Sequence, residues 1–233
     1  MQIATLTLVC SAALFGGGDK DAPSGYLQVG KSGEEKKLDP YEPREGDLIF
    51  YDDKNIFWTV LFVWAGSGPP LHMGIVVKKT DGTLAVLEAG PDDTIHVALL
   101  DLDKRLPQFD RDFKGGMVNI RRCKKELTKE QSATLTKFAE AQDGKRYAIL
   151  RLLLQGTNFS SRGPIRELFL ADTVLDRSSW ICSELSVAAG TVAGLFPASV
   201  KANVTYPLDI VDNRRHNLSR VWHDAATWSA SKR

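Results

Sequence analysis

The hydrophobic periodicity of this chain changes once, between residues 123 and 128, and this change restricts the fold more than any other feature. Residues 46–123 hold short β-type runs separated by Gly, Pro and Asp, namely "GDLIFYDD", "LHMGIVVKK", "TLAVLEAG" and "GGMVNIRRC". From residue 128 onwards apolar residues recur at helical spacing, and Thr128 with Gln131 is a capping-box signature. Strands and helices in separate blocks are typical of α+β proteins. We therefore predict an α+β fold, with an antiparallel sheet packed against helices.

Two of the β-type runs flank a short turn that contains glycine, and the length of this turn decides which side chains meet. If the loop comprises residues 80–82 with Gly82 in the left-handed conformation, Gly74 pairs with Glu88. His72 and Glu88 then become diagonal neighbours on one face of the hairpin. A two-residue loop would shift the register and place these two side chains on opposite faces. We predict the three-residue loop.

Cys182, in "WICSEL", lies where the pattern predicts the start of a helix. A thiol at this position faces unpaired N–H groups and the positive end of the helix dipole, and both favour the thiolate. His72 begins a predicted strand, and Glu88 is an acid in an apolar run, where a charge needs a partner. Such a set supplies a nucleophile, a base and a carboxylate that fixes the tautomer of the base. We predict Cys182, His72 and Glu88 as the catalytic residues.

Each of these three residues also has a purely structural interpretation. A cysteine in a helix is usually a small buried apolar residue. A histidine at a strand end often does no more than hydrogen-bond its neighbours, and Glu88 would equally serve to neutralise a nearby Lys or Arg. The chemistry therefore depends on whether the fold brings the three side chains together.

The stretches "GDLIF", "HMGIVV…LEAG" and "WICSEL" resemble the NlpC-type branch of papain-like cysteine hydrolases, in pieces spread over residues 42–212. The histidine precedes the cysteine here, as in the circularly permuted subgroup, the YaeF/YiiX-like permuted papain amidases, which are relatives of the lecithin:retinol acyltransferase-like proteins. This resemblance implies a permuted papain-like fold with the nucleophile at a helix N-terminus. It implies that Cys182 is the nucleophile, His72 the base and Glu88 the third polar residue, and that Asp47 has a structural role at a strand start.

The N-terminal part of the chain predicts two segments ahead of the domain. Residues 1–18 are mostly apolar or small and offer small-residue cleavage positions, so we predict a signal segment; the alternative is a first buried strand or helix. Residues 19–41 are rich in Gly, Pro and charge and predict a polar linker. Residues 42–233 then form the hydrolase domain. A cleaved signal would place the protein outside the cytoplasm, periplasmic or secreted, whereas an uncleaved segment would leave it cytoplasmic.

Charge and residue spacing exclude several classes of partner. Thirty basic and 29 acidic residues give a net charge of +1, so no large field indicates a nucleic acid or an acidic partner. His96, His216 and His223 have no partner at metal-binding spacing, and we predict neither a metal nor a cofactor. Cys123, at the end of a basic strand, is interpreted as structural. Tyr51 and Tyr147 either line the site or are half-buried aromatic residues, and we favour the second interpretation.

Two stretches, residues 56–64 ("IFWTVLFVW") and 145–176, match no motif of this family, and we expect them to shape a substrate groove. The first is too short to span a bilayer, which needs about 20 residues. The favoured function is hydrolysis of amide bonds in a peptide or cell-wall peptide. One alternative is a thiol acyltransferase or thioesterase acting on lipids, which the apolar residues 56–64 favour. The other is a binding module without catalytic activity.

Overall fold

The computed structural model describes residues 24–30, 36–90, 94–155, 157 and 175–231 of the 233-residue chain. The predicted signal segment, residues 1–18, lies outside the described residues. So do residues 156 and 158–174, which belong to the stretch 145–176 that matches no family motif.

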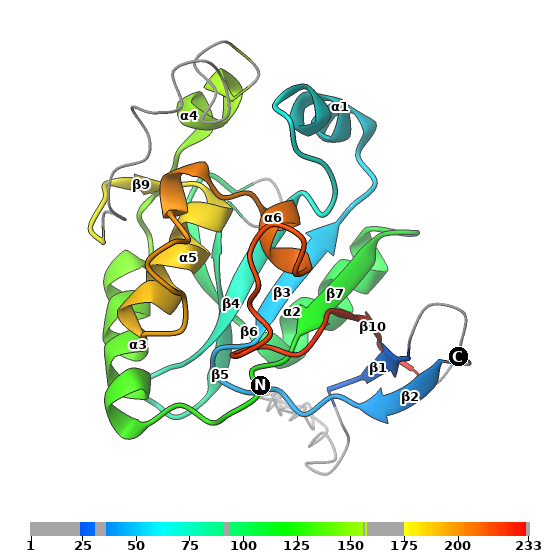
Figure 1. The fold of residues 1–233 in the computed structure, drawn as a ribbon, viewed down its shortest axis with the longest axis vertical. Coiled ribbons are helices and arrows are strands. Elements are labelled where there is room, and N and C mark those ends of the chain that lie inside the picture. The colour runs from blue at the N-terminus through cyan, green and yellow to red at the C-terminus, as the bar shows by residue number, and fades with distance from the viewer. Residues whose placement is uncertain (1–23, 31–35, 91–93, 156, 158–174, 232–233) are drawn as a thin grey trace, which may run out of the picture.

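The core of the fold is an eight-stranded sheet with the order β2-β1-β10-β7-β3-β4-β5-β6, in which every neighbouring pair is antiparallel (Figure 1). The predicted α+β class with an antiparallel sheet is therefore confirmed. The strands of this sheet are β1 (Tyr26–Val29), β2 (Lys37–Pro40), β3 (Leu48–Asp52), β4 (His72–Lys78), β5 (Leu84–Ala89), β6 (Val97–Asp101), β7 (Met117–Arg121) and β10 (Ala226–Ser229).

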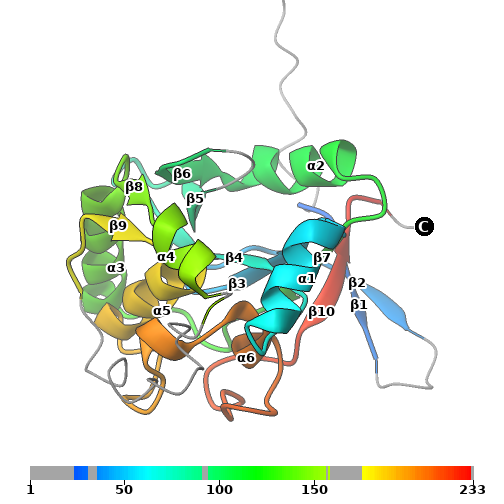
Figure 2. The same cartoon turned by 90° about the horizontal axis from the view of Figure 1, so that it is seen from above.

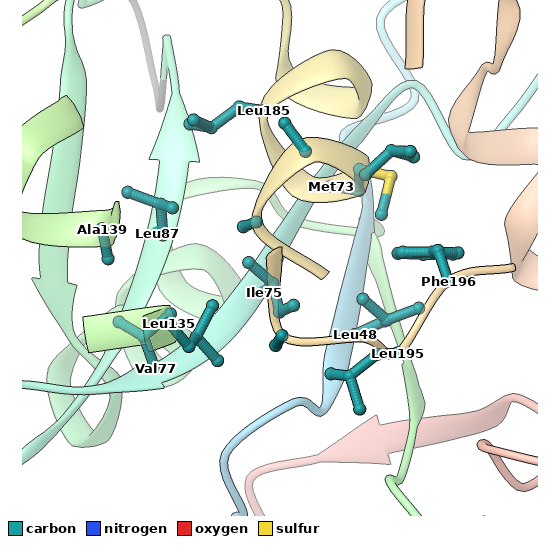
Figure 3. Close-up of a cluster of buried hydrophobic side chains, with 14 of the residues drawn as sticks. Leu48, Met73, Ile75, Val77, Leu87, Leu135, Ala139, Leu185, Leu195 and Phe196 are labelled. Carbon is teal, nitrogen blue, oxygen red and sulfur yellow. The ribbon is translucent and has the colours of Figure 1, made fainter. Parts of the chain in front are cut away.

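Helices cover both faces of this sheet (Figure 2). On one face, α3 (Lys129–Gln142) and α5 (Cys182–Val192) pack with side chains such as Leu135 and Leu185 onto Ile75 and Leu87 of the sheet (Figure 3). On the other face, the apolar side of α2 (Leu102–Asp112) packs onto the alternate residues of the same strands. Because side chains alternate along a strand, β4 and β5 contribute to both cores.

The remaining elements lie around the end of the sheet at which β4 begins. They are α1 (Ile56–Trp64), the short parallel pair β8 (Arg146–Tyr147) and β9 (Ser179–Trp180), α4 (Ile149–Leu154), the 3-10 turn η2 (Ala202–Val204) and α6 (Pro207–Val211). In Figure 1, α1 and α4 project from the top of the molecule on either side of the sheet end. These two helices carry most of the apolar sequence for which no family motif was found.

The β4–β5 hairpin has the predicted three-residue loop. The N–H of Lys79 donates to the carbonyl of Thr83 at 2.9 Å, and Gly82 has φ of 86°. Gly74 lies opposite Glu88, as that loop requires. The register prediction is confirmed, because a left-handed glycine at the third loop position is the conformation this hairpin type needs.

The prediction of a polar linker over residues 19–41 is wrong for the part of this range that the structure describes. β1 and β2 pair with one another within this range, and β1 also pairs with β10 near the C-terminus. Leu27 of β1 lies opposite Trp228 of β10, and both side chains are buried. A four-residue strand has too little alternation to be recognised, and its partner lies about 200 residues away, so local sequence carried no sign of this pairing.

Candidate active site

Cys182 is the first residue of α5, as predicted. Ile181 precedes it with extended backbone, and the side chain of Glu184 accepts a hydrogen bond from the Ile181 N–H at 3.3 Å. Cys182 itself is buried. The chain thus reverses from β9 into a helix at the cysteine, which places the thiol beside the unpaired N–H groups of the first turn.

His72 and Glu88 form the pair that the hairpin register predicts. The His72 Nε2 lies 2.8 Å from the Glu88 Oε2, with the imidazole 20 % exposed and the carboxylate fully buried. Gly74 makes this approach feasible, because a Cβ there would lie 2.5 Å from Val86 Cγ1 and 2.8 Å from Glu88 Cγ. Glycine at position 74 therefore provides the space in which the Glu88 side chain crosses to the imidazole.

Cys182 lies next to the imidazole of His72. Burial lowers the pKa of His72, but hydrogen bonding to Cys182, the charge of that sulfur and the bond to Glu88 outweigh burial and raise the pKa from 6.5 to about 10. Because Glu88 binds Nε2, Nδ1 is the ring nitrogen left for the thiol. The structure thus brings together the three residues singled out in the sequence, with His72 in the middle.

Arg105 is part of this cluster and was missed in the sequence. Its Nε donates to Glu88 Oε1 at 2.9 Å and its Nη2 to Glu88 Oε2 at 3.0 Å, with both side chains buried. The Tyr51 hydroxyl donates to the same Oε1 at 2.8 Å, and the Arg105 guanidinium stacks over the Tyr51 ring. Tyr51, expected to be half-buried, is fully buried and part of the carboxylate's environment.

The charge of Glu88 is therefore fixed in the folded protein. Burial raises the pKa of this carboxyl, but the hydrogen bond from His72 and the charge of Arg105 outweigh burial and lower the pKa from 4.5 to about 2. Burial and the adjacent Glu88 charge raise the pKa of Tyr51, so its phenol stays protonated and can donate. Glu88 is a permanently ionised acceptor for four N–H and O–H groups.

A pocket of about 460 Å³ opens beside His72. Its walls include Trp58 and Phe62 from α1, and Ile149 and Leu152 from α4. Phe62 and Leu152 also border a much smaller cavity that reaches Cys182. The described parts of the two unmatched stretches, α1 and α4, therefore line this pocket, whereas residues 158–174 lie outside the described residues.

Tyr147 also lines this pocket. Its ring packs against Gly90 so closely that a Cβ there would lie 2.9 Å from the ring. Burial and the charges of Cys182 and Glu184 raise the pKa of the Tyr147 phenol. Tyr147 is half-buried, as expected, and its hydroxyl remains protonated at neutral pH.

Asp47 and Cys123 form a separate structural cluster. Asp47 accepts from the N–H groups of Cys123 and Arg44 and from the hydroxyl of Tyr41, and burial raises its pKa to about 7. The Cys123 thiol donates to the carbonyl of Lys125, and burial raises the pKa of that thiol. Cys123 and Cys182 are both free thiols. These contacts join the start of β3 to the end of β7, which supports a structural role for Asp47.

The other three histidines lie apart from this cluster. His96 forms an isolated bridge with Arg146, the N–H of His223 donates to the carbonyl of Arg122, and His216 lies in the loop that follows α6. Within the ranges that the structure describes, no three His, Cys, Asp or Glu side chains form a set that could hold a metal ion.

Comparison with known proteins gives a likeness among solved structures. No family model and no curated protein matches the chain. Among solved structures, the chain is similar to the metalloprotein YiiX from Escherichia coli O157:H7, a DUF1105 protein. The two share 20 % sequence identity over 66 % of this chain and 67 % of that one, with a TM-score of 0.43.

Proposed function

We propose that the protein is a cysteine-dependent hydrolase that cleaves amide bonds in peptides or cell-wall peptides. The observation that carries this proposal is the position of His72 between the carboxylate of Glu88 and the thiol of Cys182, beside a pocket. An imidazole held at one nitrogen by an ionised carboxylate keeps the other nitrogen directed at the nucleophile. The raised pKa of His72 favours an imidazolium at neutral pH, which can protonate a leaving group.

The reaction would proceed in two balanced steps. The Cys182 thiolate attacks the carbonyl carbon, and the His72 imidazolium gives its proton to the leaving nitrogen, so that the C–N bond breaks and a thioester forms. His72, now neutral, takes a proton from water as the water oxygen attacks the thioester. The carboxylic acid product leaves, and the proton on His72 restores the starting pair with the thiolate.

Glu88 would stabilise the positive charge on His72 throughout, and Arg105 and Tyr51 would hold Glu88 in place. Because Arg105 binds both oxygens of Glu88, its positive charge offsets part of the attraction between the Glu88 carboxylate and the charged His72 imidazole. Glu88 would therefore act mainly by orienting the imidazole, and less by its charge.

A second candidate is a thiol acyltransferase or thioesterase that uses the same residues on lipid esters or amides. The apolar walls that α1 and α4 give the pocket favour this candidate, because Trp58, Phe62 and Leu152 suit a hydrocarbon chain. A binding module without activity is the third candidate. The presence of all three groups, the thiol of Cys182, the imidazole of His72 and the carboxylate of Glu88, makes this candidate the least favoured.

The test is activity-based profiling of the purified protein with peptide-like acyl-amide probes and with lipid-ester probes. Intact-mass measurement would follow acylation, and Cys182→Ala would be compared with Cys123→Ala as a matched control. The proposal requires turnover and an acyl adduct that Cys182→Ala loses and Cys123→Ala retains. Turnover that survives Cys182→Ala contradicts the proposal, preference for the ester probes favours the second candidate, and neither adduct nor turnover favours a binding module.

A further inference from the structure

Helix α1 presents an apolar stripe to solvent. Five large side chains at relative positions i, i+1, i+4, i+7 and i+8 lie on one side of the helix and are 58–79 % exposed, namely Ile56, Phe57, Val60, Val63 and Trp64. This spacing normally marks the buried face of a helix. The helix has a second apolar side as well, because Trp58 and Phe62 line the pocket beside His72. The outward stripe is thus additional to the side that packs.

Helix α4, on the other side of the pocket, repeats this arrangement. Its outward side chains are 39–78 % exposed, namely Ile149, Leu150, Leu153 and Leu154. The single charged residue of the helix, Arg151, points inward, where its Nη1 donates to Glu184 Oε1 at 2.8 Å and its Nη2 to the Ser179 carbonyl at 2.7 Å. Helix α1 contains no charged residue. We call the exposed side chains of α1 and α4 together the apolar rim.

The two helices that carry the apolar rim, α1 and α4, project on the same side of the molecule, as both views show (Figures 1 and 2). The pocket beside His72 is lined by both helices, so its apolar walls continue into the rim. Exposed apolar surface of this extent marks a site of interaction with a protein or a membrane. The position of the pocket distinguishes these two partners.

We propose that the apolar rim binds the surface of a lipid bilayer, so that the pocket beside His72 opens toward the membrane. A folded protein that covered both helices would also cover the substrate entrance, whereas a fluid bilayer covers the rim and can deliver molecules into the pocket. The absence of outward charge on either helix matches an uncharged hydrocarbon phase. Trp64 is of a residue type enriched at the membrane interface, and Phe57 is of a type found on the apolar side of interfacial helices.

The binding mode is peripheral. Helix α1 has 9 residues, and within the described parts of the chain no helix is long and apolar enough to cross a bilayer. An interfacial segment instead inserts its apolar side to a depth of about 5–10 Å. The choice of a bilayer over a protein rests on the proposed function, but membrane binding can be measured without turnover, because the apolar rim lies outside the cluster of Cys182, His72 and Glu88.

The experiment is flotation of the full chain with vesicles of phosphatidylcholine, together with quenching of tryptophan fluorescence by brominated phosphatidylcholine. Trp64→Glu and Leu150→Glu test the two halves of the rim. Ala133→Glu, on an exposed position of α3 away from the rim, adds the same charge as a matched control. Because the rim side chains are exposed, these variants should melt like the wild type.

We expect the wild type and Ala133→Glu to float, and each rim variant to bind about tenfold more weakly. Bromolipid quenching should fall in Trp64→Phe, since Trp64 supplies the inserted fluorophore. Cys182→Ala should bind like the wild type, which separates this proposal from the proposed activity. Wild type that stays with the soluble fraction, or rim variants that float unchanged, would overturn the proposal. A lipid-free dimer that the rim variants dissociate, without flotation of the wild type, would assign the rim to a second copy of the chain.

Discussion

Replacement of Glu88 by glutamine, which keeps the volume of the side chain, should destabilise the protein strongly. Glu88 is fully buried and accepts from His72, Tyr51 and two N–H groups of Arg105 at 2.8–3.0 Å. Arg105 binds both carboxylate oxygens, so either orientation of the amide places its NH₂ group against a guanidinium donor. The Arg105 charge is then left buried without its partner.

The expected loss follows from this geometry. Removal of one partner of a buried ion pair costs about 3–5 kcal/mol, because the remaining charge is uncompensated. For a chain of this length, 1 kcal/mol corresponds to about 2–4 °C, so Glu88→Gln should lower the Tm by about 6–20 °C. The double variant Glu88→Gln/Arg105→Met removes both charges and should recover most of this stability.

Activity should not recover along with stability. In the double variant the neutral amide at position 88 can donate as well as accept, so it no longer fixes the tautomer of His72, and turnover per folded molecule should fall by between about 10-fold and 10⁴-fold. The assay is thermal unfolding by circular dichroism, combined with turnover normalised to acylated Cys182, on the same preparation of wild type, both single variants and the double variant. If the double variant regained full turnover together with stability, Glu88 would serve only to neutralise Arg105. An unchanged Tm in Glu88→Gln would refute the buried ion pair itself.

Three further predictions concern the same cluster. Iodoacetamide at about pH 6 should alkylate Cys182 before Cys123, because burial raises the pKa of the Cys123 thiol, whereas Cys182 has the imidazole of His72 beside it to take up its proton. Equal labelling of the two cysteines in a peptide map contradicts the assignment of the nucleophile. The His72 pKa is raised to about 10, so the stability that its charged form contributes is complete below about pH 6.5 and is lost as the pH rises through about 10. The difference in Tm between wild type and His72→Ala should accordingly become smaller at high pH. A difference that becomes larger there would contradict a raised pKa of His72. Gly74→Ala should lower the free energy of unfolding, measured with denaturant, by about 1–3 kcal/mol, because the added Cβ would overlap Val86 and Glu88. An unfolding midpoint equal to that of the wild type would show that the hairpin can shift to accommodate the Cβ.

The parts of the fold that could be predicted are those set by neighbouring residues. The turn at Gly82 fixes the β4–β5 register, and the register alone places His72 within reach of Glu88. The capping box of Thr128 and Gln131 marks the start of α3, where both hydrogen bonds of the box are present. In each case the constraint acts within about 20 residues and requires one conformation.

Arg105 and its helix could not be predicted in the same way. The apolar face of α2 holds Leu102, Leu106 and Phe109 at i, i+4 and i+7, which is helical spacing. Pro107 lies inside this helix, and proline normally ends a helical pattern, so the segment carries conflicting signals. The sequence does contain one signal for the pairing, which is the position of Arg105 on the apolar face of α2. A buried cation requires a buried acid, and Glu88 in its apolar run is an acid that requires a partner.

The approach of Cys182 to His72 shows why the site as a whole exceeds what the sequence pattern can predict. Met73 and Ile75 belong to the core under α5, so by alternation His72 lies on the opposite side of β4, where Tyr51 and α2 pack. Cys182 begins a helix that covers the first side. The two residues meet because His72 is the first residue of its strand, at the end of the sheet, and the thiol lies at the end of its helix. The imidazole reaches across the sheet end, with Glu88 and Arg105 holding it from one side and the thiol approaching from the other. A pairing of this kind depends on where α5 ends relative to the sheet, and that position is set by packing between segments more than 100 residues apart, such as β4 and α5.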